Sequence, residues 1–150
     1  MEKLRKDIVY FLKQQRFVIV ASVDKEGFPH TSCKGIVKVE EDKIYILDLY
    51  LKDTYANIKR NKLVSITAVD EDRFMGYCIK GRAKMVDLAS DKDMLKKWDS
   101  RLLERASRRV LSHIKKDKSS LYHPEINMPR PKYMIEIEPK KIISLIPPHE

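Results

Sequence analysis

Residues 17–39 read FVIVASVDKEGFPHTSCKGIVKV, and this stretch decides the fold class. Its first seven residues are apolar on both faces and rich in β-branched side chains, which predicts a strand buried on both sides. The polar sequence DKEG that follows predicts a hairpin turn, in which Gly27 can take a positive φ. A second strand is predicted over His30–Val39, so the stretch forms an antiparallel hairpin.

Strand patterns recur along the rest of the chain. We expect further strands at Ile44–Leu49, Leu63–Val69, Tyr77–Val86, Tyr133–Ile137 and Ile142–Ile146. Apolar residues at three- and four-residue steps predict helices over residues 1–15 and 91–118, and a short helix is expected within residues 51–61. Short antiparallel hairpins favour a barrel over a doubly wound sheet, so the expected fold is mainly β with helices, an α+β chain.

Length and composition point to one soluble domain covering residues 1–150. Apolar residues make up 43% of the chain, which argues against disorder, and no apolar run approaches the roughly 20 residues of a membrane span. The first ten residues, MEKLRKDIVY, do not resemble a secretory signal, so we expect a cytoplasmic protein. Two cysteines without CxxC spacing and four scattered histidines predict neither a disulfide scaffold nor a metal site.

The net charge of +9 is concentrated in one segment. Residues 92–118 hold ten basic and four acidic side chains within the long predicted helix. We interpret them as a solvated helix face, with nucleic-acid binding as a disfavoured alternative. The sequence contains neither GxGxxG nor GxxxxGK[ST], so Rossmann and P-loop nucleotide binding are not supported.

The segment KDTYAN, residues 52–57, joins a buried strand to the short helix. The first turn of a helix offers backbone N–H groups and a favourable dipole to a phosphate. Thr54 would add a hydroxyl and Lys52 a positive charge. Capping of the helix by Asp53 or Thr54 is the alternative interpretation.

The segment TSCKG, residues 31–35, lies within the second predicted strand. A glycine inside a strand marks a bulge or the close approach of a ligand to the backbone, and Gly35 fits both interpretations. Cys33 stands beside Lys34 and could be a reactive thiol, although a cysteine in a strand is more often a core residue.

Three runs, taken in order, resemble the pyridoxamine 5′-phosphate oxidase-like family, the FMN-binding split barrels. They are FVIVASVDKEGFPHTSCKG, IYILDLYLKDTYANIKRNKLVSITAV and GYCIKGRAKMV, and the resemblance covers residues 7–88 best. It implies an antiparallel split barrel of six to seven strands, with the helix 91–118 inserted before the last strands. It also implies a homodimer with FMN at the subunit interface.

The resemblance also implies which residues contact the cofactor. The second strand, with Ser32, Cys33, Lys34 and Gly35, would lie along the flavin ring. The phosphate would be held by Lys52, Thr54 and Asn57. The sequence KGRA, residues 80–83, resembles the strand that approaches the flavin of the partner subunit.

The chain departs from the family at its C-terminus, which reads IISLIPPHE. It lacks the Trp- and Arg-containing ending by which true pyridoxamine 5′-phosphate oxidases hold their substrate. We therefore expect an FMN-dependent oxidoreductase acting on another small molecule, with no catalytic acid or base evident in the sequence. The alternatives are a deazaflavin or heme in the same fold, a flavin-binding protein without catalysis, and a basic nucleic-acid-binding barrel.

Overall fold

The computed structural model describes residues 2–48, 52–88, 91–116 and 131–146. Over these ranges the chain forms six strands and three helices. The strands are β1 (Val18–Val23), β2 (Pro29–Val39), β3 (Ile44–Asp48), β4 (Leu63–Asp70), β5 (Met75–Asp87) and β6 (Tyr133–Ser144). The helices are α1 (Lys6–Gln14), α2 (Asp53–Arg60) and α3 (Lys92–Lys116).

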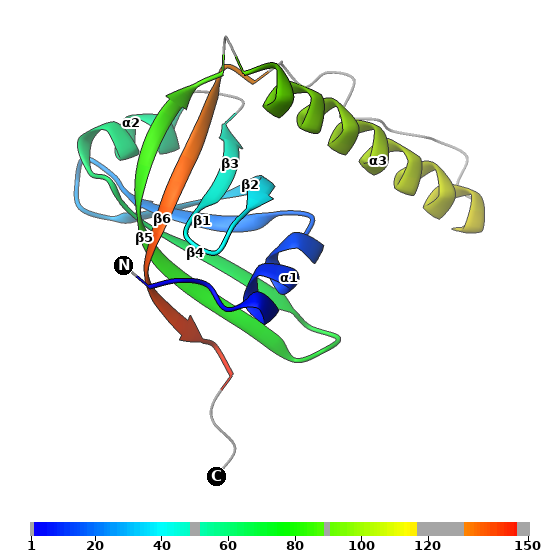
Figure 1. Cartoon of the computed structure of the whole chain (residues 1–150), viewed down its shortest axis with the longest axis horizontal. Coiled ribbons are helices and arrows are strands. Elements are labelled where there is room, and N and C mark those ends of the chain that lie inside the picture. The colour runs from blue at the N-terminus through cyan, green and yellow to red at the C-terminus, as the bar shows by residue number, and fades with distance from the viewer. Residues whose placement is uncertain (1, 49–51, 89–90, 117–130, 147–150) are drawn as a thin grey trace.

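The six strands close into an antiparallel barrel in the order β1-β2-β3-β6-β5-β4. The last strand, β6, pairs with β3 on one side and β5 on the other, and so completes the barrel. Figure 1 shows α1 and α2 on different sides of the barrel, with α3 inserted between β5 and β6. The antiparallel barrel and the position of the long helix, both predicted from the sequence, are confirmed.

Isoleucine side chains fill the barrel. The inward-facing isoleucines of the strands are almost fully buried: Ile36, Ile44, Ile46, Ile66, Ile79, Ile135 and Ile137. Helix α1 adds Ile8, Phe11 and Leu12, whose three- and four-residue spacing places them on one face against this core. Burial of so much aliphatic surface is the main term that stabilises the barrel.

The predicted hairpin turn between β1 and β2 is confirmed. Gly27 has a φ of 91°, which a residue with a Cβ rarely adopts. The Asp24 carboxylate accepts hydrogen bonds from the backbone N–H groups of Glu26 and Phe28, and so organises the turn from within.

Strand β1 differs from the expectation of burial on both faces. Its inward side chains are buried, but Ile19 is 42% exposed, and Phe17 just before the strand is 58% exposed. The described part of the chain leaves both side chains open on the outer face of β1. The apolar run of residues 17–23 therefore includes side chains on an outer surface that the barrel does not cover.

The two strands predicted near the C-terminus form one strand, β6. The sequence EPKK, residues 138–141, suggested a break, but Pro139 pairs with Gly81 next to a shift in the β5–β6 register. Gly81 admits this strand, because a Cβ there would lie 2.7 Å from the carbonyl oxygen of Glu138. Leu49 of the predicted third strand and residues 117–118 of the predicted helix lie outside the described residues.

Helix α3 packs on the barrel mainly near its beginning. Met94 and Trp98 are buried against Leu47, Leu88 and Met134. Further along, Leu103 is 70% exposed, and Figure 1 shows the helix extending away from the barrel. Among the helices formed by described residues, none has the length and apolar character needed to cross a bilayer.

Candidate functional site

Strand β2 meets the first turn of α2 through two hydroxyl groups. The Ser32 Oγ and the Thr54 Oγ1 lie 2.9 Å apart and share a hydrogen bond. Thr54 is buried, whereas Ser32 is half-buried. The strand predicted to follow the flavin ring and the helix predicted to hold its phosphate therefore converge at this pair.

A buried ion pair lies on the same strand, two residues further on. The Lys34 ammonium donates to Oδ1 of Asp48, the last residue of β3, over 2.9 Å. The side chain of Asp48 is 1% exposed, and its Oδ2 accepts no hydrogen bond from the described residues. Lys34, predicted to contact the cofactor, thus neutralises a buried carboxylate, and the free oxygen leaves one acceptor at the site.

Asp48 was not identified from the sequence. Its signal was a carboxylate at the end of the apolar run IYILD, residues 44–48. A buried charge of this kind requires a partner of opposite charge. The alternation of side chains along the neighbouring strand β2 would have suggested Lys34 as that partner.

Asn57 lies in a buried polar network beneath α2. Its amide nitrogen donates to the Ser22 hydroxyl over 3.1 Å, and its amide oxygen accepts from Arg60 over 3.0 Å. Arg60 also donates to the carbonyl of Val23. The network ties α2 to the end of β1, so Asn57 positions the helix that carries Thr54.

Neither Asp53 nor Thr54 caps α2. The N-cap residue is Lys52, and no side chain makes a capping hydrogen bond at this end. The Thr54 hydroxyl bonds to Ser32 instead. The first N–H groups of a helix have no partner within it, so the start of α2 retains its attraction for an anion, and the exposed Lys52 adjoins it.

Gly35 and Cys33 lie on the other side of β2 from Ser32 and Lys34. Cys33 is exposed, so the interpretation of this thiol as a core residue is wrong. Gly35 is approached by Arg105 of α3, whose Nη2 would lie 2.9 Å from a Cβ at that position. Arg105 also donates to the carbonyl of Arg16 over 2.5 Å. The close approach predicted at Gly35 is therefore made, in this structure, by an arginine.

The outer faces of β1, β4 and β5 form a partly apolar surface. A cleft of about 360 Å³ there is lined in part by Ala21, Leu63 and Lys80. Ile19, Leu63 and Val69 are each more than 40% exposed on this side. Lys80, which begins the sequence KGRA, therefore borders a cleft beside an uncovered apolar face.

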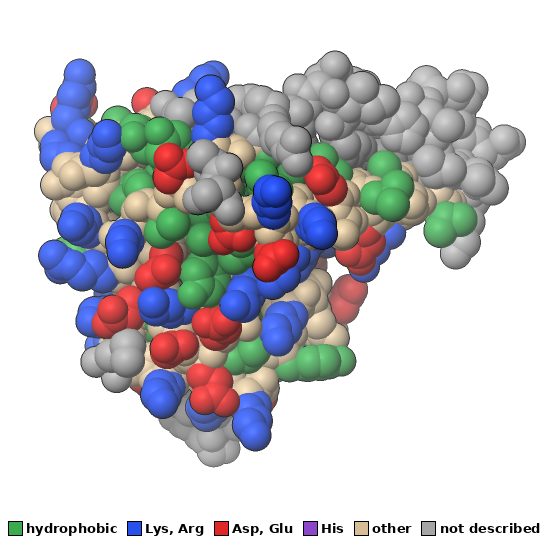
Figure 2. Space-filling model, turned by 45° about the horizontal axis from the view of Figure 1, so that its top comes forward, with side chains coloured by type: hydrophobic (Ala, Val, Ile, Leu, Met, Phe, Trp, Pro, Cys, Tyr) green, Lys and Arg blue, Asp and Glu red, His purple; other side chains and the backbone are tan. Residues whose placement is uncertain are grey.

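Basic side chains of α3 are mostly exposed to solvent, as expected: Lys92, Lys96, Lys97 and Arg108 are exposed, and Arg101 and Arg105 are half-buried. On the face shown in Figure 2, Lys and Arg side chains are interspersed with Asp and Glu. Several of the α3 cations also line cavities between α3 and α1. No group of three or more His, Cys, Asp or Glu side chains among the described residues is arranged to hold a metal ion.

The sequence profile of the pyridoxamine 5′-phosphate oxidase family matches residues 4–145, nearly the whole chain. The chain belongs to the pyridoxamine 5′-phosphate oxidase family. Its closed six-stranded barrel with three helices matches the split barrels of solved structures in this family. A comparison with curated proteins finds no match.

Solved structures with the family fold carry different names. HupZ of Group A Streptococcus is 20% identical, with a TM-score of 0.66 over 95% of this chain and 94% of its own. An F420 reductase is 15% identical, with a TM-score of 0.61 over 89% of this chain and 94% of its own. HutZ, the heme storage protein of Vibrio cholerae, is 20% identical, with a TM-score of 0.54 over 94% of both chains. At these identities the likeness establishes the fold of this family member.

Proposed function

We propose that the protein binds FMN where β2 meets α2 and uses it to oxidise or reduce a small molecule. The observation that carries the proposal is the hydrogen bond between the hydroxyls of Ser32 and Thr54. It joins the two segments that we expect to contact the ring and the phosphate.

The residues present suit a phosphate ester. Two hydroxyls hold two O–H donors, and the bond between Ser32 and Thr54 uses one of them. The second remains for a phosphate oxygen, because Thr54 can accept the bond from Ser32 and present its own O–H. Lys52 and the start of α2 add positive charge and backbone donors.

Bound FMN would supply the electron transfer, while the protein binds and orients it. Thr54 and Lys52 would hold the phosphate end, Ser32 would orient the Thr54 hydroxyl, and Asn57 would keep α2 in place through Ser22. The C-terminal sequence IISLIPPHE supports a substrate other than pyridoxamine 5′-phosphate. Two free cysteines suit a reducing compartment, so we place the protein in the cytoplasm.

A homodimer is part of the proposal. The uncovered apolar side chains Phe17, Ile19 and Leu63 are the kind of surface that a subunit interface buries. A second subunit placed there would also bring its cofactor close to Lys80. Light scattering at micromolar concentration should give about twice the 17.7 kDa of one chain; a purely monomeric species would contradict the dimer.

The visible spectrum of the purified protein distinguishes the cofactors, because flavin, deazaflavin and heme absorb differently. We expect a flavin spectrum, and phosphate recognition can then be tested by titrating FMN and riboflavin, which differ only in the phosphate. Loss of one hydrogen bond to a charged group costs about 1.5–3 kcal/mol, roughly ten- to a hundredfold in affinity. Thr54→Val and Lys52→Ala should each lower FMN affinity by about that factor.

Riboflavin affinity should barely change in either variant. The loss of FMN affinity caused by Lys52→Ala should be smaller at high salt than at low salt. Asp53→Asn is a matched control, since Asp53 adjoins Thr54 but is assigned no contact with the phosphate. Equal weakening of riboflavin and FMN by Thr54→Val would contradict the phosphate assignment.

A further inference from the structure

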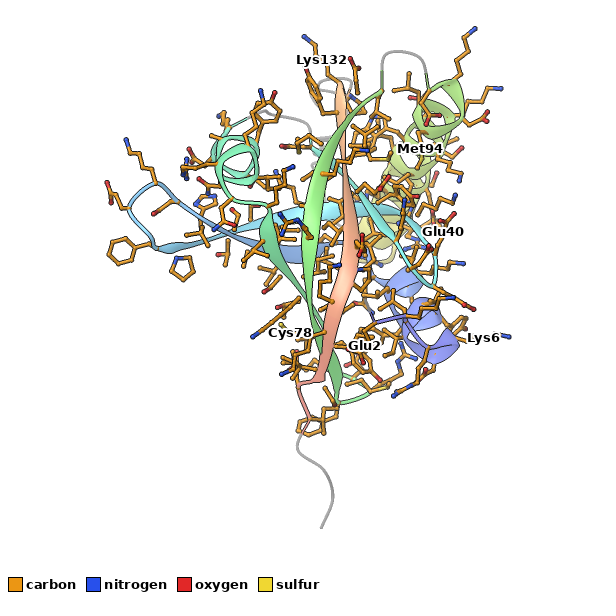
Figure 3. All side chains as sticks on the ribbon, turned by 60° about the vertical axis from the view of Figure 1, so that its left-hand side comes forward. Glu2, Lys6, Glu40, Cys78, Met94 and Lys132 are labelled. Carbon is orange, nitrogen blue, oxygen red and sulfur yellow. The ribbon has the colours of Figure 1, made fainter. Side chains whose placement is uncertain are left out.

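Two adjoining cavities form a groove between α1 and α3, and β2 makes its floor. The first, of about 490 Å³, is lined by Lys13, residues 36–40, Lys97 and Arg101. The second, of about 370 Å³, is lined by residues 13–16, Arg101, Glu104, Arg105 and Arg108. Lys13 and Arg101 border both cavities, which makes them one continuous surface, here called the α1–α3 groove. Figure 3 shows Glu40 on the side of the barrel where both helices lie.

The α1–α3 groove is strongly positive. Its lining contains seven basic side chains, which are Lys13, Arg16, Lys38, Lys97, Arg101, Arg105 and Arg108. The two carboxylates in the lining are already paired, Glu40 with Lys38 and Glu104 with Arg108. Seven cations and two anions leave a net charge of +5. The Lys38 ammonium, which donates a hydrogen bond to Glu40, holds the pKa of that carboxyl below its usual value, so the carboxylate stays ionised.

Most of the remaining cations form no ion pair within the part of the chain that the structure describes. Lys13, Arg16, Lys97 and Arg101 form no ion pair with the described carboxylates. Like charges four residues apart on a helix repel each other, and Lys97, Arg101 and Arg105 follow that spacing on α3. An anion in the groove would replace this repulsion with attraction.

Arg105 is held in place before any ligand arrives. Its guanidinium donates to the carbonyl of Arg16 and lies over Gly35, where a Cβ would stand 2.9 Å from Nη2. An arginine fixed in this way loses little conformational entropy when an anion binds beside it. The planar guanidinium also matches phosphate oxygens better than an ammonium does.

The charge of the lining indicates the charge of the ligand. One phosphate group carries at most about two negative charges and leaves most of the net charge of +5 unbalanced. Two or more linked phosphates balance more of it. The floor of the first cavity includes the half-buried Val37, which offers a small apolar surface to an organic group.

We propose that the α1–α3 groove binds a nucleotide with two or more phosphate groups. The phosphates lie along Arg101, Arg105 and Lys13, and the organic part lies over Val37. None of these residues takes part in the Ser32–Thr54 contact, so the proposal does not depend on flavin binding.

Calorimetric titration of the full chain with ATP, ADP, AMP and adenosine at low ionic strength tests the proposal. Affinity should rise with the number of phosphates, adenosine should not bind, and salt should weaken binding. Arg101→Gln and Lys13→Gln should each lower ATP affinity by roughly tenfold or more, the effect of losing one hydrogen bond to a charged group.

The matched control is Lys25→Gln, in the β1–β2 turn, which Figure 1 shows on the side of the barrel away from α3. This variant should bind ATP like the wild type, and circular dichroism should show all three variants folded. Absence of ATP binding, or an equal loss in Lys25→Gln, would overturn the proposal. Tighter binding of a single-stranded oligonucleotide than of ATP would also overturn it, in favour of a nucleic acid.

Discussion

Lys34→Met should be among the more destabilising single substitutions that replace a charged side chain in this protein. It removes the ammonium 2.9 Å from Asp48 and leaves a carboxylate that is 1% exposed without its partner. Removing one member of a buried ion pair typically costs about 3–5 kcal/mol. Methionine keeps the length of the lysine stem, so lost packing contributes little.

The Lys38–Glu40 pair is a matched control on the same strand. Both of its side chains are 38% exposed, and such a pair contributes about 0–1 kcal/mol. Urea unfolding, followed by circular dichroism, should therefore show a much larger loss of unfolding free energy for Lys34→Met than for Lys38→Met.

A second substitution separates the charge from the rest of the side chain. Asp48→Asn in the Lys34→Met background removes the buried charge and should recover about half of the lost stability, because an amide is less costly to bury than a carboxylate. Equal losses in Lys34→Met and Lys38→Met, or no recovery in the double variant, would refute the argument that burial of the Asp48 charge sets the cost.

Three further substitutions test the backbone and the core by unfolding free energy. Gly27→Ala should destabilise by about 1–2 kcal/mol, because φ at this position is 91°; an unchanged midpoint would show that the turn can rearrange. Phe74→Gly should stabilise by up to about 1 kcal/mol, because Phe74 has a φ of 51° and is 75% exposed; a clear loss would mean that the ring packs in solution. Ile46→Ala should cost about 2–5 kcal/mol, and the exposed Leu103→Ala at most about 0.5 kcal/mol; similar values would contradict the assigned core.

The barrel was predictable because its signals are local. Alternating or continuous apolar runs identified the strands, and Asp24 and Gly27 identified the first turn within a few residues. The C-terminal strand was divided wrongly because a proline usually interrupts a strand. Only the pairing of Pro139 with Gly81, almost sixty residues away in the chain, explains why it does not.

The site was predictable as a set of segments and not as a set of contacts. The sequence identified β2 and the start of α2, but the Ser32–Thr54 bond joins residues that only the closed barrel brings together. Asp48 escaped notice because the pairing of a buried carboxylate with Lys34 depends on β2–β3 geometry. The contact of Arg105 with Gly35 depends on how α3 lies, which periodicity alone does not specify.

The position of β6 between β3 and β5 has a consequence for biosynthesis. Strand β3 ends at residue 48, whereas its neighbour β6 begins at residue 133. At about 5–20 residues per second, the ribosome needs roughly 4–17 s to make the intervening 84 residues. During that interval β3 lacks this neighbour, and so does β5 once it has been made; their unpaired backbone groups can join to another nascent chain. Chaperone binding to the nascent protein should therefore be strongest before residue 133 emerges and fall once β6 has inserted.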